Sequence, residues 1–322
     1  MAFPLHLLFV MTLILGSLVA INSSSWLIVW IGLEVNLLSI LPLMAAEKTK
    51  GSSESCVKYF LVQSMASLLI LISSVFVFST FLFDSFVMIF VGLMMKLGVA
   101  PFHFWFPTVM EGVSWYNCAL LMTWQKLAPL FLMSFVNIMI LFIFITSLVG
   151  AIGGFGQISI KKILAFSSIN HVGWMLAGML WGIKIGLIYY VTYFIMSLLI
   201  VLFFYSFKLF YINQMSFTSN FLKFATLINL LSLGGMPPFL GFFPKWVVIE
   251  KLLWSSFILA MILILSSLIS LYFYLRVVYP AFLASVVGSE ESLGGTMYVG
   301  VLVAFFFLSS GGVFCFPLLS SI

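Results

Sequence analysis

Residues 94–107 read MMKLGVAPFHFWFP, an apolar stretch interrupted by Gly98, Pro101 and Pro107. A proline inside a helix removes one backbone hydrogen bond and expels the carbonyl four residues earlier, here that of Leu97. In lipid, a carbonyl freed in this way must be satisfied by protein or by water in a cavity. The stretch therefore predicts an interrupted membrane helix that borders such a cavity.

Residues 233–246 read LGGMPPFLGFFPKW and repeat the spacing PF-x-x-x-FP of the first stretch. Pro237 and Pro238 free the carbonyls four residues before them, which belong to Leu233 and Gly234. Interrupted helices at matching places in two inverted halves are typical of transporters. Chance similarity in a chain rich in Phe and Pro is the alternative explanation.

The composition of the whole chain agrees with a membrane protein. Hydrophobic residues make up 64% of the 322 residues and charged residues 7%, against roughly 45–50% and 25% in soluble domains. So few charges cannot cover the surface of a soluble globule, which excludes a soluble enzyme and a disordered chain. The net charge of +5 comes from scattered lysines that form no stripe, so nucleic acid is not an expected partner.

Long apolar runs divide the chain into about eleven spanning helices, each of roughly 20 residues. They lack the ten-residue alternation of a membrane β-barrel, so the expected fold is all-α, a polytopic transmembrane bundle. We expect two inverted five-helix repeats, about 1–135 and 136–284, and an extra C-terminal helix. The expected spans are 3–21, 25–45, 58–82, 85–106, 112–135, 136–155, 161–181, 185–211, 221–250, 255–284 and 297–319.

Basic residues predict the orientation of the chain in its membrane. Those after even-numbered spans are Lys48, Lys50, Lys58, Lys161, Lys162, Lys208 and Lys223. Only Lys184 and Lys251 lie on the other side, so the positive-inside rule places the N-terminus and the even loops inside. The first basic residue is Lys48, so we expect insertion through the first helix without a basic presequence.

Neither cysteine nor histidine spacing indicates a cofactor. Cys56, Cys118 and Cys315 form no CxxC motif, which argues against an iron–sulfur site and against a disulfide framework. Three histidines cannot supply the paired axial ligands of several haems. We therefore expect no metal and no redox centre in this chain.

Four charged residues fall inside the apolar spans: Glu34, Lys96, Lys126 and Lys245. One such group at the bilayer centre costs about 2.5–3.5 kcal/mol or more, so these side chains are expected to face the bundle interior. A functional interpretation is a chain of proton-loading sites, because making or breaking a Glu–Lys pair changes how readily the lysine holds its proton. The alternatives are fixed ion pairs between helices and, for Lys245, an extension to the membrane surface beside Trp246.

His103 and His171 are candidates for proton relays between the lysines, because histidine titrates near neutrality. Each is equally compatible with a hydrogen-bonded core histidine. The glycine run at 150–156, GAIGGFG, follows no soluble strand, so close helix packing is expected there in place of nucleotide binding.

Several longer motifs resemble one family. They are WIGLEVNLLSILPLM, KYFLVQSMAS, MKLGVAPFHFWFPTVMEG, LMTWQKLAPL, GAIGGFGQISIKKILAFSSINHVGWML and LSLGGMPPFLGFFPKW. In order and spacing, from about residue 25 to 280, they resemble subunit 2 of mitochondrial NADH:ubiquinone oxidoreductase (respiratory complex I), in its eleven-helix metazoan form.

The resemblance implies a function for the four buried charges. Family motifs fall on Glu34, Lys96, Lys126 and Lys245, and imply a hydrated proton path through an antiporter-like subunit of the membrane arm. It also implies that NADH, FMN, iron–sulfur clusters and ubiquinone bind to other subunits. Neighbouring antiporter-like and small membrane subunits, phospholipids such as cardiolipin, and the mitochondrial inner membrane are the implied surroundings.

Two alternatives remain at this point. A stand-alone cation/proton antiporter would use the same helices, and a non-pumping structural subunit would contain the same charges as fixed pairs. The structural alternative predicts that Lys126→Ala damages assembly only, whereas a proton path predicts assembled complexes with impaired turnover.

Overall fold

The computed structural model describes residues 3–47, 49–76, 82–136, 140–217 and 220–283. Within these ranges the regular structure is helical, and the only β-bridge joins Ser159 and Tyr211. The all-α prediction is therefore confirmed. The chain divides into two compact units, Met1–Ile145 and Thr146–Ile322, which are described separately.

Membrane-spanning character is clear from helix length and apolarity. Within the described ranges, five helices are long and apolar enough to cross a membrane, and two shorter apolar helices accompany them. The chain is thus a multi-pass membrane protein. The predicted span at 297–319 lies outside the described residues.

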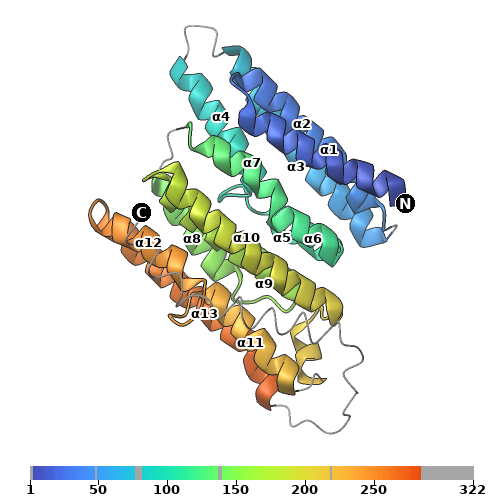
Figure 1. The fold of residues 1–322 in the computed structure, drawn as a ribbon, viewed down its shortest axis with the longest axis vertical. Helices are drawn as coiled ribbons and strands as arrows, with labels where there is room; N and C mark the ends of the chain where they lie inside the picture. The colour runs from blue at the N-terminus through green and yellow to red at the C-terminus, as the bar shows by residue number, and fades with distance from the viewer. Residues whose placement is uncertain (1–2, 48, 77–81, 137–139, 218–219, 284–322) are drawn as a thin grey trace. The chain divides into compact units, whose positions relative to one another are not determined.

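The first unit consists of seven helices and the start of an eighth within its described residues, and Figure 1 shows their order by colour. α1 and α2 pack side by side, and α3 packs against both α2 and α4. The helices are α1 (Phe3–Asn22), α2 (Trp26–Ala45), α3 (Lys50–Phe76), α4 (Leu82–Leu97), α5 (Trp105–Gly112), α6 (Trp115–Met122) and α7 (Trp124–Met133).

The second unit begins within α8 and is built around α9, which packs against α10, α12 and α13. All but two residues of α9 are buried, so this helix is the centre of the unit. The elements are α8 (Ile140–Gly153), α9 (Ile160–Met179), α10 (Ile183–Ser206), the 3₁₀ helix η1 (Ile212–Phe217), α11 (Asn220–Gly234), α12 (Phe242–Leu253) and α13 (Phe257–Leu283).

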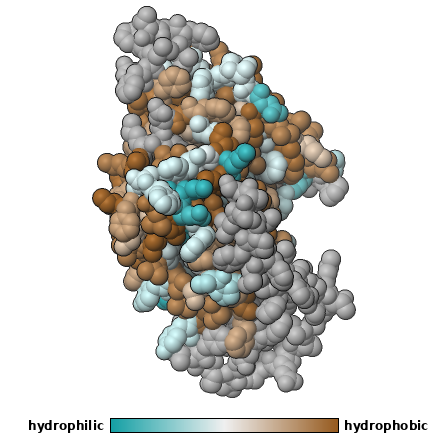
Figure 2. Space-filling model, turned by 60° about the vertical axis from the view of Figure 1, so that its left-hand side comes forward, coloured by the Kyte–Doolittle hydropathy of each residue, from teal (hydrophilic) through white to brown (hydrophobic). Residues whose placement is uncertain are grey.

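The helix α3 has its polar side inside and its apolar side outside. Its buried residues include Tyr59, Gln63 and Ser67, whereas Leu61 and Met65 are more than half exposed. This pattern inverts that of a soluble helix and is expected where the outer solvent is lipid. The described surface in Figure 2 is accordingly mostly brown, the colour of hydrophobic residues.

Small residues bring helices into backbone contact. A Cβ added to Gly32 of α2 would lie 2.8 Å from the carbonyl oxygen of Gly16 in α1 and 2.7 Å from the backbone nitrogen of Ala20. In the second unit, a Cβ on Gly150 would meet the backbone of Asn170 in α9. The prediction of close packing at the 150–156 glycine run is confirmed for Gly150.

Both predicted interruptions are present, and they share one construction. The helix α4 ends at Leu97 and α11 ends at Gly234, and the next residue in each case is a glycine with positive φ, +70° at Gly98 and +81° at Gly235. A left-handed glycine is the usual residue just after a helix C-terminus. The helices resume as α5 and α12, and each of these begins four residues after a proline, Pro101 or Pro238.

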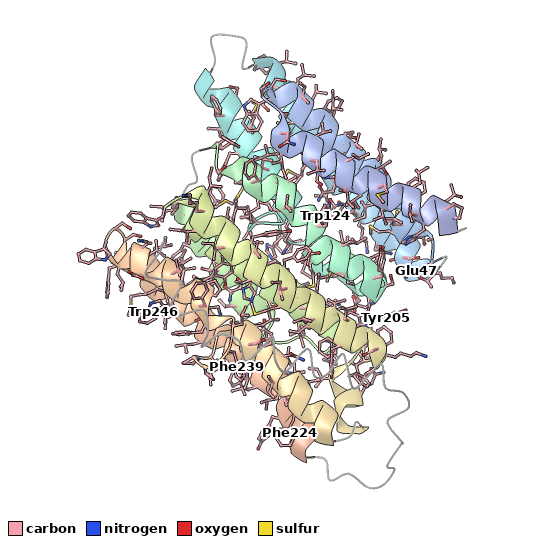
Figure 3. The ribbon with its side chains drawn as sticks, viewed as in Figure 1. Glu47, Trp124, Tyr205, Phe224, Phe239 and Trp246 are labelled. Carbon is pink, nitrogen blue, oxygen red and sulfur yellow. The ribbon has the colours of Figure 1, made fainter. Side chains whose placement is uncertain are left out.

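A third interruption was not predicted. The expected span 112–135 is divided at Thr123, whose backbone angles, φ −109° and ψ −83°, are not helical. The Thr123 hydroxyl donates a hydrogen bond of 2.6 Å to the carbonyl of Ala119 in the preceding turn. Such local bonding by a threonine competes with the helix, and it separates α6 from α7, whose first residue is Trp124 (Figure 3).

Candidate functional site

A cavity in the first unit is lined by side chains from six helices, α2 to α7. It offers about 20 Å³ to the centres of water molecules, and one ordered water needs roughly 10–15 Å³ of such space. Its polar lining consists of Asn36, Tyr59, Gln63, Lys96, Gln125 and Lys126. The cavity therefore brings two of the predicted lysines to one polar space.

Lys96 lies at the end of α4, where the helix is interrupted, and is 7% exposed. Two buried donors reach the carbonyls beside it: Gln63 donates to the carbonyl of Lys96 at 3.5 Å, and Trp105 Nε1 to that of Met95 at 3.2 Å. These carbonyls lie one and two residues before Leu97, the position predicted from Pro101. The broken end of α4 is thus held by side chains of the cavity wall.

Lys126 is 2% exposed and lies in the first turns of α7. Its ammonium lies 4.7 Å from the ring centroid of Phe106, in α5. A cation over an aromatic face at this distance is attracted by the ring without forming an ion pair. The interrupted fourth span therefore contributes an aromatic face to one lysine and a helix end to the other.

Glu34 lies on α2, half-buried, and one of its carboxylate oxygens is fully buried without a hydrogen-bond partner. It is close enough to Lys96 for an electrostatic interaction. Glu54 and Lys58 form a salt bridge on the surface of α3, but within the described ranges no salt bridge joins Glu34 to Lys96. Among the described residues, Glu34 and Lys96 therefore do not form a fixed ion pair.

Two amide atoms beside the lysines carry unmet hydrogen-bonding capacity. The Oδ1 atom of Asn36 and the Nε2 atom of Gln125 are buried, and neither has a hydrogen-bond partner. The other amide atom of Gln125 accepts a bond of 3.5 Å from the Tyr59 hydroxyl. An ordered water in the cavity could donate a hydrogen bond to the free acceptor and accept one from the free donor.

Lys245 lies in α12 and is held by the interruption of the ninth span. Its ammonium donates to the carbonyl of Gly234 at 2.7 Å and to that of Leu233 at 3.4 Å. These are the two carbonyls predicted to be freed by the prolines. Lys245 is 5% exposed while its neighbour Trp246 is 45% exposed (Figure 3), so an extension of Lys245 to the membrane surface is wrong.

His171 lies on the central helix α9 and is 4% exposed. Its Nδ1 atom is 2.9 Å from the hydroxyl of Tyr189 in α10. Three residues further along α9, Trp174 lies beneath the ammonium of Lys245, with 5.7 Å between that nitrogen and the ring centroid. One face of α9 thus carries both a histidine and the aromatic neighbour of a buried lysine.

Comparison with known proteins gives the family. The domain family described as "NADH:quinone oxidoreductase/Mrp antiporter, TM" matches residues 23–270. NADH-ubiquinone oxidoreductase chain 2 of Anopheles gambiae is 44% identical over 95% of this chain and 95% of its own length. The chain belongs to the NADH-ubiquinone oxidoreductase chain 2 family.

Another member of this family, from Lemur catta, is 37% identical over 86% of this chain and 85% of its own. Solved structures share the fold at lower identity. A chain of respiratory complex I from Thermus thermophilus superposes with a TM-score of 0.84 at 23% identity, covering 95% of this chain and 77% of that one. A chain of the Mrp complex from Dietzia gives 0.83 at 17% identity, covering 97% and 75%.

Not every candidate residue of this chain 2 member lies in a common site. His103 is 8% exposed within the interruption after α4, and its ring contacts that of Phe104 with 4.2 Å between centroids. It is not part of the lining of the cavity that contains Lys96 and Lys126. His103 therefore stays a predicted relay, without a contact to either lysine that would support the role.

Sequence reasoning missed the uncharged part of the site in this chain 2 member. Tyr59 and Gln63 are spaced four residues apart, and Gln125 directly precedes Lys126. A polar pair at helical spacing inside an apolar span lies on one face, and that signal was available in the sequence. The pairing of His171 with Tyr189 joins two helices and had no local signal.

Lys161 is a further buried cation, interpreted from the sequence as an orientation signal only. It lies in the first turn of α9 and is 8% exposed, with its ammonium 5.3 Å from the ring centroid of Phe210. Its burial depends on the segment after α10, which returns to pair with Ser159 through Tyr211. Nothing near Lys161 in the sequence indicates that return.

Proposed function

We propose that this chain carries protons across the mitochondrial inner membrane as a membrane-arm subunit of NADH:ubiquinone oxidoreductase. Electron transfer from NADH to ubiquinone, which takes place in other subunits, would supply the energy. Membership of the chain 2 family supports the assignment to the complex. The observation that carries the proton-path role is the polar cavity lined by both Lys96 and Lys126.

The chemistry of the cavity suits proton transfer. A buried lysine can exist with or without its extra proton, because burial disfavours the charged form and nearby carbonyls, rings or carboxylates favour it. Lys126 has an aromatic face beside it and Lys96 has Glu34 within electrostatic range. A water bound by Asn36 and Gln125 would provide the hydrogen-bonded link between the two amines.

Lys245 and His171 would serve the same task in the second unit. The two carbonyls that accept from Lys245 stabilise its charged form without a fixed acid. A neutral partner leaves the charge dependent on changes elsewhere, whereas a bound carboxylate would hold it permanently. The proposed path residues are therefore Glu34, Lys96, Lys126 and Lys245, with His103 and His171 as relays.

The cofactors of the overall reaction belong to other subunits in this proposal. Within the described residues, no group of three His, Cys, Asp or Glu side chains could hold a metal ion. NADH, FMN, iron–sulfur clusters and ubiquinone would all be bound elsewhere. In this proposal, the contribution of this chain is proton movement.

The surroundings follow from the same assignment. The lysine distribution supports an N-terminus on the matrix side. Neighbouring antiporter-like and small membrane subunits would cover part of the apolar exterior, and phospholipids such as cardiolipin the rest. Contact with other subunits is in keeping with the complexes from which similar structures come.

The test begins with native gel electrophoresis of gently solubilised membranes and mass spectrometry of the bands. We expect this chain only in a very large band that oxidises NADH. A small free species without NADH activity would favour the stand-alone cation/proton antiporter, and sodium- or potassium-driven proton flux in vesicles would then be measured. If the large complex assembled but Lys96 and Lys126 variants pumped normally, the chain would be a non-pumping structural subunit.

A further inference from the structure

We propose that Tyr189 is a positioning residue for proton transfer at His171, and that its hydroxyl is the group through which Nδ1 exchanges a proton. The inference rests on the proposed function, because it assigns His171 to the proton path. It extends that function to a residue on a different helix, α10. The observation behind it is the 2.9 Å contact between the Tyr189 hydroxyl and Nδ1 of His171.

Both partners are enclosed by the protein. Tyr189 is 1% exposed and His171 is 4% exposed, so water at the surface cannot replace either of them in the contact. The Tyr189 ring stacks on that of Trp174 with 13° between planes, and the Tyr193 ring lies 5.0 Å from the imidazole. These aromatic contacts fix where the hydroxyl points, so the hydrogen bond is built into the packing of α9 and α10.

A hydroxyl suits a histidine that changes its protonation state. When the imidazole is neutral, the hydroxyl donates to Nδ1 and the ring hydrogen is on Nε2. When the imidazole is charged, Nδ1–H donates to the phenol oxygen, so the contact is kept in both states. A carboxylate partner would favour the charged form and a carbonyl could only accept.

The proton count of the tyrosine does not change in this step. A proton delivered to the phenol oxygen by the preceding carrier of the path forms a new O–H bond there, while the bond between that proton and the carrier breaks. The original O–H bond breaks as its proton passes to Nδ1, so the phenol stays neutral and the imidazole becomes charged. The reverse sequence discharges the histidine. No oxidant, reductant or phenolate is required.

The stacked rings of Tyr189 and Trp174 place the His171–Tyr189 pair close to Lys245. Trp174 contacts the Tyr189 ring, with 6.3 Å between centroids, and also lies 5.7 Å from the ammonium of Lys245. A charge on Lys245 is therefore separated from the His171–Tyr189 pair by one indole. Gain or loss of that charge would change how readily His171 holds a proton, because the two groups are separated by one ring.

The experiment uses the assembled complex with four variants: Tyr189→Phe, His171→Leu, the double variant, and Tyr190→Phe. The last is a matched control, because Tyr190 is the next residue of α10 and is also buried, at 4% exposure. NADH oxidation with an artificial electron acceptor measures assembly and electron entry to the complex. Ubiquinone-coupled turnover and protons moved per electron pair measure the path.

We expect Tyr189→Phe to keep the artificial-acceptor rate and to lower coupled turnover about two- to tenfold, the effect of one buried hydrogen bond. The double variant should be no slower than His171→Leu, because both changes interrupt one transfer. Tyr190→Phe should match the unaltered complex. Additive losses in the double variant, or full proton stoichiometry in Tyr189→Phe, would overturn the role of Tyr189.

Failure of this inference is distinguishable from failure of the proposed function. If Tyr189→Phe pumps normally while Lys245→Ala does not, the proton path stands and Tyr189 has no part in it. If Lys245→Ala, Lys126→Ala and Tyr189→Phe all pump normally in assembled complexes, the proposed function fails together with the inference.

Discussion

Individual lysines in this membrane protein are stabilised by different neutral neighbours. Lys126 lies over the ring of Phe106, and Lys245 donates to two backbone carbonyls. The groups that accept from Lys245 are uncharged carbonyls, not an acid. At the residue scale, this is the difference between a charge that only holds helices together and a charge that can be gained and lost.

The first prediction concerns Lys126. Replacement by Met keeps the apolar stem and removes the amine, so we expect the complex to assemble and coupled turnover to fall about tenfold or more. Positioned proton carriers contribute roughly 10²–10⁴-fold. Ubiquinone-coupled NADH oxidation and proton stoichiometry are the measurements. Lys50→Ala is the control, since Lys50 is exposed at the start of α3. Normal stoichiometry in Lys126→Met would exclude Lys126 from the path.

Burial of the charged residues could be predicted from the sequence, but their partners could not. The energetic penalty of a charge in an apolar span identifies Lys96, Lys126 and Lys245 without any knowledge of the fold. The neighbours Phe106 and Tyr59 come from other helices, and only packing brings them to the lysines. Uncharged polar residues carry a smaller penalty in an apolar span, so Tyr59 gave a weaker signal.

At the scale of the helix, the two interruptions are built alike. Each first half ends just before a left-handed glycine, and each second half begins four residues after a proline. The glycine turns the chain, and the proline prevents the helix from continuing. This correspondence supports the predicted repeat, although the lysines occupy different halves of the two copies.

The second prediction tests the interruption itself. In Gly235→Ala the new Cβ would lie 2.8 Å from Cδ of Lys245, and a left-handed backbone costs a non-glycine residue about 1–2 kcal/mol. We expect a lower melting temperature of the complex and reduced coupled turnover. Gly156→Ala is the matched control, because nothing lies within 4 Å of a Cβ added there. Equal behaviour of the two variants would contradict the described geometry.

The third prediction concerns the contact between α1 and α2. A methyl group on Gly32 meets backbone atoms of α1, which cannot rotate away, so the helices must separate. Overpacking of this kind costs about 1–3 kcal/mol, and we expect less assembled complex on a native gel for Gly32→Ala. In Gly51→Ala the nearest atom lies at 3.6 Å, and assembly should be normal. An unchanged band intensity for Gly32→Ala would argue against this contact.

Helix boundaries show where sequence reasoning fails at this scale. Proline and glycine marked the interruptions in the fourth and ninth spans, but the division at Thr123 has neither residue in it. A threonine hydroxyl can bond the preceding turn in an intact helix as well as in a broken one. Whether the helix breaks at Thr123 is decided by the packing of α6 and α7, and no local sequence pattern predicts that packing.

At the scale of the whole chain, composition and periodicity are sufficient for the fold class. Few charges and long apolar runs leave a helical membrane bundle as the only suitable architecture. The helix α3 follows this pattern, with a polar buried side and an apolar exposed side. The cavity could not be predicted, because side chains of six helices, α2 to α7, contribute to its wall.

The fourth prediction tests orientation in the membrane. Single cysteines at two exposed lysines, Lys50→Cys and Lys184→Cys, should be labelled by an impermeant thiol reagent from opposite sides of the inner membrane. We expect the first to react from the matrix and the second from the intermembrane space, in a background in which Cys56, Cys118 and Cys315 are all replaced by Ser. Labelling of both from one side would disprove the predicted topology.

Lys245 donates hydrogen bonds to two backbone carbonyls, and this has a consequence for inherited variation. No nucleotide change can delete a backbone oxygen. A survey that ranks alleles by the charge or polarity of the altered side chain would therefore miss the groups that bind this ammonium. Harmful alleles near Lys245 should instead concentrate at Gly235, Pro237 and Pro238, which set the course of the chain. A Gly235→Ala allele is a conservative change by most scales of chemical similarity, but we expect it to be inherited together with a defect in energy conversion.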